Sequence, residues 1–126
     1  MFLDGHALLF HSARGGGTAF YLTTRADDAS PWSPPVLLAS PARGLHGWVS
    51  PCGLELYFHH DAGTGTGDDF YLARRASVDE PFGASVKLPE LSSAGFDQDL
   101  RLSPDRHHAY FASNRGGNND IYEASR

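Results

Sequence analysis

The chain has little of several features that mark common protein classes. It has one cysteine among its 126 residues, Cys52, so no disulfide can form within the chain. No apolar run approaches the roughly 18 residues needed to cross a bilayer, so no membrane association is expected. The first ten residues contain Asp4 and have no Lys or Arg before the apolar stretch, so they do not predict a signal peptide. The compartment is left open.

An excess of positive charge is also missing. The formal net charge is −5 and the isoelectric point is near 5.7, so nothing predicts neutralisation of nucleic-acid phosphates. Hydrophobic residues make up 40% and charged residues 20% of the chain, which is typical of globular proteins. We therefore expect residues 1–126 to form one domain with a packed core.

Catalytic and cofactor motifs are missing as well. The chain has no Gly-x-Ser-x-Gly, no phosphate-binding loop and no His-Glu-x-x-His. The acidic pairs 27–28 and 68–69 fall in expected loops, where solvated turns explain them better than acid–base catalysis. We expect a protein that is not an enzyme and has no cofactor.

What the chain does contain is an internal repeat of about fifty residues. Segments 8–25, 56–75 and 109–126 align on a phenylalanine, a later tyrosine and a closing arginine. The repeats run approximately over 1–44, 45–95 and 96–126. The aligned residues are Phe10, Phe58 and Phe111, then Tyr21, Tyr71 and Tyr122, then Arg25, Arg75 and Arg126.

Each repeat predicts up to four short strands, A to D. Strand A is expected at 45–50 and 98–103, and strands B, C and D follow at the aromatic and Val-Leu runs. Gly-, Asn- and Asp-rich turns separate them. A helix over 68–80 is the competing prediction, but the aligned segments of the other repeats do not continue as helices.

The third repeat, LSPDRHHAYFASNRGGNNDIYEASR, closely resembles a blade of the TolB-like β-propeller family. The second repeat departs from the pattern at Cys52 and at 59–61. The resemblance implies an all-β, β-propeller-like fold of antiparallel blades, with strand A lining a central channel. Proteins of this family are often periplasmic or extracellular.

The predicted strands follow the order BCD, ABCD, ABC, which gives ten strands in three blades. Propellers close with four to eight blades, so three are too few for a ring. We expect the chain to assemble with itself, with two copies giving six blades favoured and three copies possible. The alternative is a piece of a longer propeller with a structural role only.

The function expected from these features is a binding or interaction scaffold for a protein or small ligand. The alternative is a propeller-type enzyme, such as a glycosidase or lyase, with its site at the channel. In strand A, alternation places His46, Trp48, Asp99 and Arg101 on one face. We predict that these four residues line the channel and bind the ligand.

The loops between strands B and C, at 14–19, 61–69 and 115–120, suggest either calcium ligands or plain hairpins, and hairpins are favoured. Arg115 and Asp120 bracket the third loop and are predicted to pair across it. Adjacent histidines at 59–60 and 107–108 point to opposite faces, so no metal site is predicted. His11 and His59 share one repeat position and could approach each other.

Overall fold

The computed structural model describes residues 1–41, 43–61 and 67–126, and over them the chain forms ten strands and no helix. The described residues therefore contain no helix long and apolar enough to span a membrane. The prediction of an all-β fold is confirmed, and segment 68–80 forms no helix but contains a strand over residues 69–74. The strands are β1 (Ala7–Ser12), β2 (Ala19–Thr24), β3 (Val36–Leu37), β4 (Leu45–Val49), β5 (Glu55–His60), β6 (Asp69–Arg74), β7 (Val86–Lys87), β8 (Asp97–Leu102), β9 (His108–Ser113) and β10 (Asp120–Ser125).

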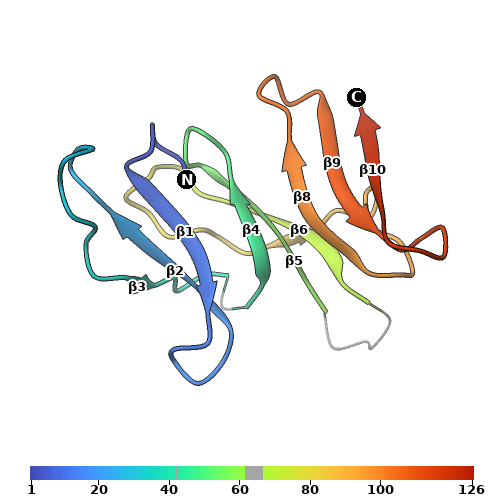
Figure 1. Cartoon of the computed structure of the whole chain (residues 1–126), viewed down its shortest axis with the longest axis horizontal. Helices are drawn as coiled ribbons and strands as arrows, with labels where there is room; N and C mark the ends of the chain where they lie inside the picture. Colours follow the sequence, from blue (N-terminus) through green and yellow to red (C-terminus); the bar gives the residue numbers. More distant parts are fainter. Residues whose placement is uncertain (42, 62–66) are drawn as a thin grey trace.

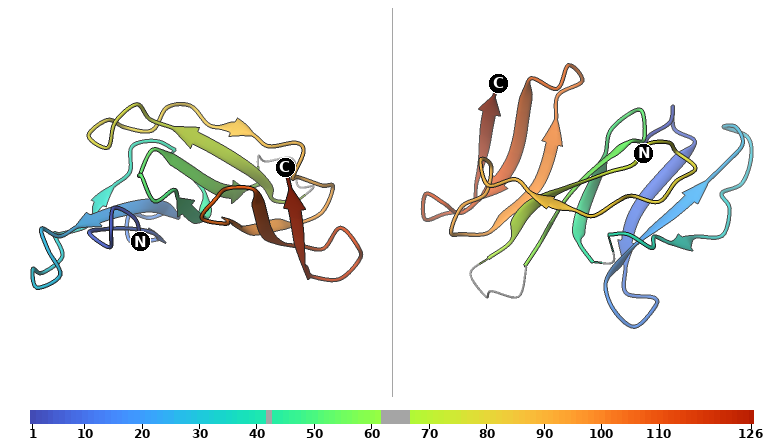
Figure 2. Two further views of the ribbon diagram at one scale, coloured as in Figure 1. Left: turned by 90° about the horizontal axis from the view of Figure 1, so that it is seen from above. Right: turned by 180° about the vertical axis from the view of Figure 1, so that it is seen from behind.

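The strands form three antiparallel sheets that lie side by side in chain order (Figure 1). The first sheet is β1-β2-β3, the second is β4-β5-β6-β7, and the third is β8-β9-β10. The predicted order of strands, with all four only in the middle repeat, is confirmed. Strand β4 contacts both β1 and β8, so the inner strand of the second sheet lies between its neighbours. Figure 2 shows two further views, in which none of the three sheets closes into a barrel.

The aromatic residues that define the repeat are opposite each other in register in every sheet. Strands B and C pair so that each phenylalanine faces the tyrosine of its own repeat, and the two rings are nearly parallel. Such cross-strand aromatic pairs stabilise a sheet by up to about 1 kcal/mol each. The ring centroids are 6.0 Å apart for Phe10–Tyr21, 5.8 Å for Phe58–Tyr71 and 6.0 Å for Phe111–Tyr122.

The arginine that closes each repeat is held in one way in all three copies. Its Nε donates a hydrogen bond to the backbone carbonyl of the turn before strand B. The turn residue has a positive φ each time, 86° at Gly5, 77° at Gly53 and 64° at Arg106. The bonds are Arg25 to Gly5 at 3.1 Å, Arg75 to Gly53 at 2.6 Å and Arg126 to Arg106 at 3.1 Å.

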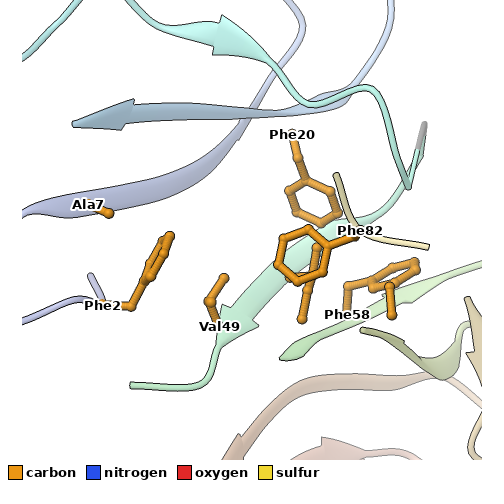
Figure 3. Close-up of a cluster of buried hydrophobic side chains, with 8 residues drawn as sticks. Phe2, Ala7, Phe20, Val49, Phe58 and Phe82 are labelled. Carbon is orange, nitrogen blue, oxygen red and sulfur yellow. The ribbon is translucent and has the colours of Figure 1, made fainter. Parts of the chain in front are cut away.

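Two hydrophobic clusters hold the sheets together. Each contains an edge-to-face phenylalanine pair, Phe20–Phe58 at 5.8 Å in the first and Phe70–Phe111 at 5.4 Å in the second. Figure 3 shows Phe20, Phe58 and Phe82 gathered in the first cluster, with Phe2 against Val49 and Ala7. The buried members of the first cluster are Phe2, Ala7, Phe20, Val49, Leu56, Phe58, Ala73 and Phe82. Those of the second are Tyr57, Phe70, Leu72, Leu100, Ala109 and Phe111.

Candidate ligand site on the inner strands

The inner strands β4 and β8 each contain a β-bulge at the same repeat position. One extra residue lies between two register pairs, so the expected simple alternation of side chains along strand A is wrong. The flanking pairs are Leu45–His59 and Trp48–Tyr57 in the second sheet, and Gln98–Ala112 and Arg101–Tyr110 in the third.

His46 and Asp99 are the aligned residues of these two bulges, and both have a left-handed backbone. Their φ values are 46° and 59°. A residue with a side chain pays roughly 1–2 kcal/mol for this conformation, and bulges often aim a side chain at a functional site. Two non-glycine residues at one repeat position in this conformation therefore point to a site here.

The two bulges bring His46 and Asp99 into direct contact. Nδ1 of His46 lies 2.6 Å from Oδ1 of Asp99, across the interface between the second and third sheets. A carboxylate can only accept, so Nδ1–H of His46 is the donor. The His46 side chain is 40% exposed and that of Asp99 is 51% exposed, so a ligand can reach both.

Two further histidines flank His46. Its ring centroid is 5.1 Å from that of His11 on β1 and 5.1 Å from that of His59 on β5. His46 therefore contacts the first sheet through His11 and the third sheet through Asp99. The sequence suggested that His11 and His59 could approach each other, and the structure places His46 between them.

His59 is buried, with 1% of its surface exposed, and neither ring nitrogen has a hydrogen-bond partner among the residues that the structure describes. Burial is the main cause that lowers its pKa below the ordinary value of 6.5; the nearby Asp68 acts in the opposite direction, and His46 lowers it further. The imidazole is therefore neutral at neutral pH. Its ring nitrogens are buried behind the exposed His46–Asp99 pair.

Trp48 and Arg101, the other two residues predicted for this site, have different surroundings. The Trp48 ring packs on Tyr57, with centroids 5.6 Å apart, beside the second hydrophobic cluster. Arg101 is exposed, and its guanidinium donates to the backbone carbonyl of Leu100. The contacts thus join His46 to Asp99, while Trp48 contributes to packing between sheets.

Arg115 pairs with Asp97 of β8 at 2.8 Å, whereas Asp120 forms no ion pair within the described residues. Ser113 donates to the same carboxylate at 2.6 Å. Burial alone would raise the pKa of Asp97, but these hydrogen bonds and that from the Ser93 backbone outweigh it and lower the pKa. The pair anchors the start of β8 rather than bracing the 115–120 loop.

The described parts of the glycine-rich loops contain no cluster of metal-ligating side chains. Over residues 1–41, 43–61 and 67–126, no group of three or more His, Cys, Asp or Glu side chains is placed to hold a metal ion. Most of loop 61–69, including Ala62, lies outside the described residues.

Arg14 stacks over Phe10 and Tyr21, and Arg115 over Phe111 and Tyr122, so both arginines cover the aromatic pair of their own repeat.

Sequence reasoning found two members of this site, His46 and Asp99, by aligning the strand A segments. It missed His59 and His11 as neighbours of His46, although their shared repeat position was the available signal. Chemically, the site offers an imidazole oriented by a carboxylate, and this pair can exchange a proton or hydrogen-bond a polar ligand.

Comparison with known proteins does not identify a family for this chain. The chain matches no family model, and no curated protein shows significant similarity to it. The function is therefore inferred from the side chains and surfaces described above.

Proposed function

We propose that the protein is a non-catalytic β-propeller module that assembles head to tail with a second copy of itself. The six sheets of the pair would form a closed ring, which acts as a binding scaffold. The ligand would bind at the His46–Asp99 site on the inner strands. The TolB-like pattern of the third repeat and the three successive antiparallel sheets support this proposal.

One observation carries the proposal: a position that is buried in two repeats is exposed in the third. Phe20 and Phe70 are aligned residues of β2 and β6, and each is 0% exposed because the next sheet covers it. The aligned residue of β10 is Ile121, which is 77% exposed. A large apolar side chain that is exposed to solvent, at a position buried in the other repeats, indicates a face that another sheet covers.

The neighbouring position on strand B shows the same difference. Tyr57 of β5 is 7% exposed, and the aligned Tyr110 of β9 is 41% exposed. Tyr110 and Ile121 therefore mark one face of the third sheet, which we call the trailing face. The equivalent face of the first sheet is covered by the second sheet, and that of the second sheet is covered by the third.

The first sheet offers the matching surface. In the second and third sheets, the opposite face packs on the preceding sheet through Leu56 with Phe58, and through Ala109 with Phe111. The aligned residues of β1 are Leu8 and Phe10, which are only half-buried. We call this the leading face. The trailing face of one copy on the leading face of another would repeat the internal interface.

Trp32 supports the same arrangement. It is aligned with Phe82, which is 3% exposed between the first and second sheets, whereas Trp32 is 37% exposed. Both rings lie against the closing arginine of their own repeat, Arg25 or Arg75. A preceding sheet from another copy would cover Trp32 as the first sheet covers Phe82. Such heterologous contacts close into a ring when the rotation allows it.

The test is the mass of the protein in solution, measured by light scattering after size exclusion. We expect twice the 13.7 kDa of one chain. Ile121→Asp is expected to give the mass of one chain, because the interface would bury an unpaired carboxylate. Val86→Asp, at a 64% exposed apolar residue of β7, is the matched control and should stay paired. A single-chain mass for the unmodified protein at every concentration would refute self-assembly.

A second candidate function, a propeller-type enzyme, is favoured by the His46–Asp99 contact alone. An imidazole held by a carboxylate is an arrangement that acts as a general base. Hydrolysis of a panel of chromogenic glycosides tests it. Turnover that Asp99→Asn abolishes would support the enzyme, and turnover unchanged in Asp99→Asn would contradict it.

A further inference from the structure

We propose that the groove between the second and third sheets, together with the edge of β10 opposite β9, binds an extended peptide segment. The segment carries an aromatic residue followed four residues later by a valine. This inference does not depend on self-assembly, because both walls of the groove belong to one chain.

The groove is a cavity of about 320 Å³ between the two sheets. The groove is large enough to receive a side chain, and most of its floor is apolar. Its apolar floor is formed by Leu72, Leu88, Leu91, Leu102, Ala109 and Ala124. Arg126 lies among the polar residues that line it.

The aligned groove between the first and second sheets is not open, because Phe82 fills it. All but one of the residues aligned with the floor belong to the cluster that buries the Phe82 ring. These are Leu22, Leu38, Val49, Leu56 and Ala73. The backbone next to Phe82 is held too, since Ser40 of the first repeat donates to the carbonyl of Gly83 at 3.2 Å. The first groove therefore shows what the second would accept.

The closing arginine of the third repeat has a free face in the described structure. Arg75 lies 4.5 Å from the centroid of Phe82, and Arg25 lies 4.8 Å from that of Trp32. Arg126 is oriented by the same kind of carbonyl bond, yet no aromatic ring covers it in the residues described. A guanidinium held in place without its ring favours a ligand that brings one.

The edge of β10 offers the backbone half of the site. The segment after the aromatic residue pairs with strand C in the first two sheets, as β3 on β2 and β7 on β6. Within the described part of the chain, β10 pairs only with β9, so its other edge is open to strand addition.

The backbone hydrogen bonds of the second repeat show the register in which a segment would pair with β10. Gly83 N donates to the Arg74 carbonyl and Leu88 N to the Phe70 carbonyl, each at 2.8 Å. The aligned carbonyls on β10 belong to Ser125 and Ile121. In the first two repeats the aromatic residue precedes a valine of the outer strand by four positions. Trp32 precedes Val36, and Phe82 precedes Val86. This spacing sets the chemistry of the ligand.

The experiment uses a fluorescein-labelled peptide with the sequence of residues 76–88, ASVDEPFGASVKL, and the full chain. Fluorescence polarisation is expected to show saturable binding. A peptide with alanine in place of its phenylalanine is expected to bind at least about tenfold more weakly, since removal of a buried phenyl ring costs more than the 1.4 kcal/mol that corresponds to tenfold.

Variants of the protein locate the site. Arg126→Ala is expected to weaken binding by about two- to fivefold through loss of the ring contact. Arg101→Ala, an exposed arginine of β8 outside the groove, is the matched control and should bind as the unmodified chain does. If the two peptides bind equally, if neither binds, or if Arg126→Ala binds as tightly as Arg101→Ala, the inference is overturned.

Discussion

The two interfaces between successive sheets share one plan but differ in how they are filled. Both have an edge-to-face phenylalanine pair at nearly the same separation. The first is closed by Phe82, which comes from the loop between β6 and β7 and packs back between the sheets. The second has no such ring and retains a cavity of about 320 Å³. One repeat unit can thus build either a closed interface or an open one, and a loop residue decides which.

The inner strands of the two interfaces also differ. In β4 the bulge contains Gly47, and a Cβ placed there would lie 2.8 Å from the Phe20 ring. The aligned residue of β8 is Leu100, which is 2% exposed and belongs to the second cluster. At this position the inner strand therefore adds a leucine side chain to the second interface and no side chain to the first.

Removing the ring that closes the first interface should have the largest effect. Phe82→Ala is expected to lower the free energy of unfolding by about 3–5 kcal/mol, as truncation of a buried phenylalanine does. Urea denaturation in the Ile121→Asp background measures this without a contribution from association. Trp32→Ala, at the aligned but exposed ring, should cost at most about 1 kcal/mol. Equal costs for the two would mean that Phe82 does not close the interface.

A smaller effect is expected from crowding the same interface at the inner strand. Gly47→Ala should lower the free energy of unfolding by about 1–3 kcal/mol, because the buried Phe20 ring must move away from the new methyl group. Gly17→Ala is the control, since a Cβ there meets nothing within 4 Å. Its cost should stay within about 0.5 kcal/mol. Chemical denaturation of both variants measures this difference. Equal stabilities of the two variants would contradict the close approach of the Phe20 ring to Gly47.

The smallest effect concerns His59, at the centre where the interfaces meet. The pKa of His59 is lowered in the folded state, chiefly by burial. As the pH falls, His59 is therefore protonated in the unfolded chain at a higher pH than in the folded chain. Its contribution to stability is complete above about pH 6.5 and decreases below it. In His59→Leu, the loss of stability between neutral and mildly acidic pH should be smaller than in the unmodified chain. Urea midpoints on both sides of pH 6.5 measure it; identical pH dependence would contradict it.

Much of the fold followed from local patterns. The aromatic runs, the turn residues between them and the threefold alignment predicted ten strands and their order, and the described residues contain them. The turns of positive φ that receive the closing arginines lie at equivalent positions of the three repeats, at Gly5, Gly53 and Arg106. These features depend on neighbours in the chain, so a single sequence reveals them.

The site was only partly predictable. His46 and Asp99 were identified by alignment, but simple alternation could not reveal the bulges that turn both residues toward each other. The predicted partner of Arg115 was Asp120, close in sequence, whereas the structure pairs Arg115 with the buried Asp97. The Asp97 carboxylate lies where Ser113 and the Ser93 backbone also converge, and that position depends on packing between segments.

By itself the sequence determined the repeat, the strands and the residues that face each other within a sheet, because turns and alternating side chains act over a few residues. Only the tertiary structure decided how the sheets pack on one another. It placed Phe82 in the first groove, left the second groove open and brought His46 between His11, His59 and Asp99. Those outcomes depend on bulges and on contacts between residues far apart in the chain, which local patterns do not specify.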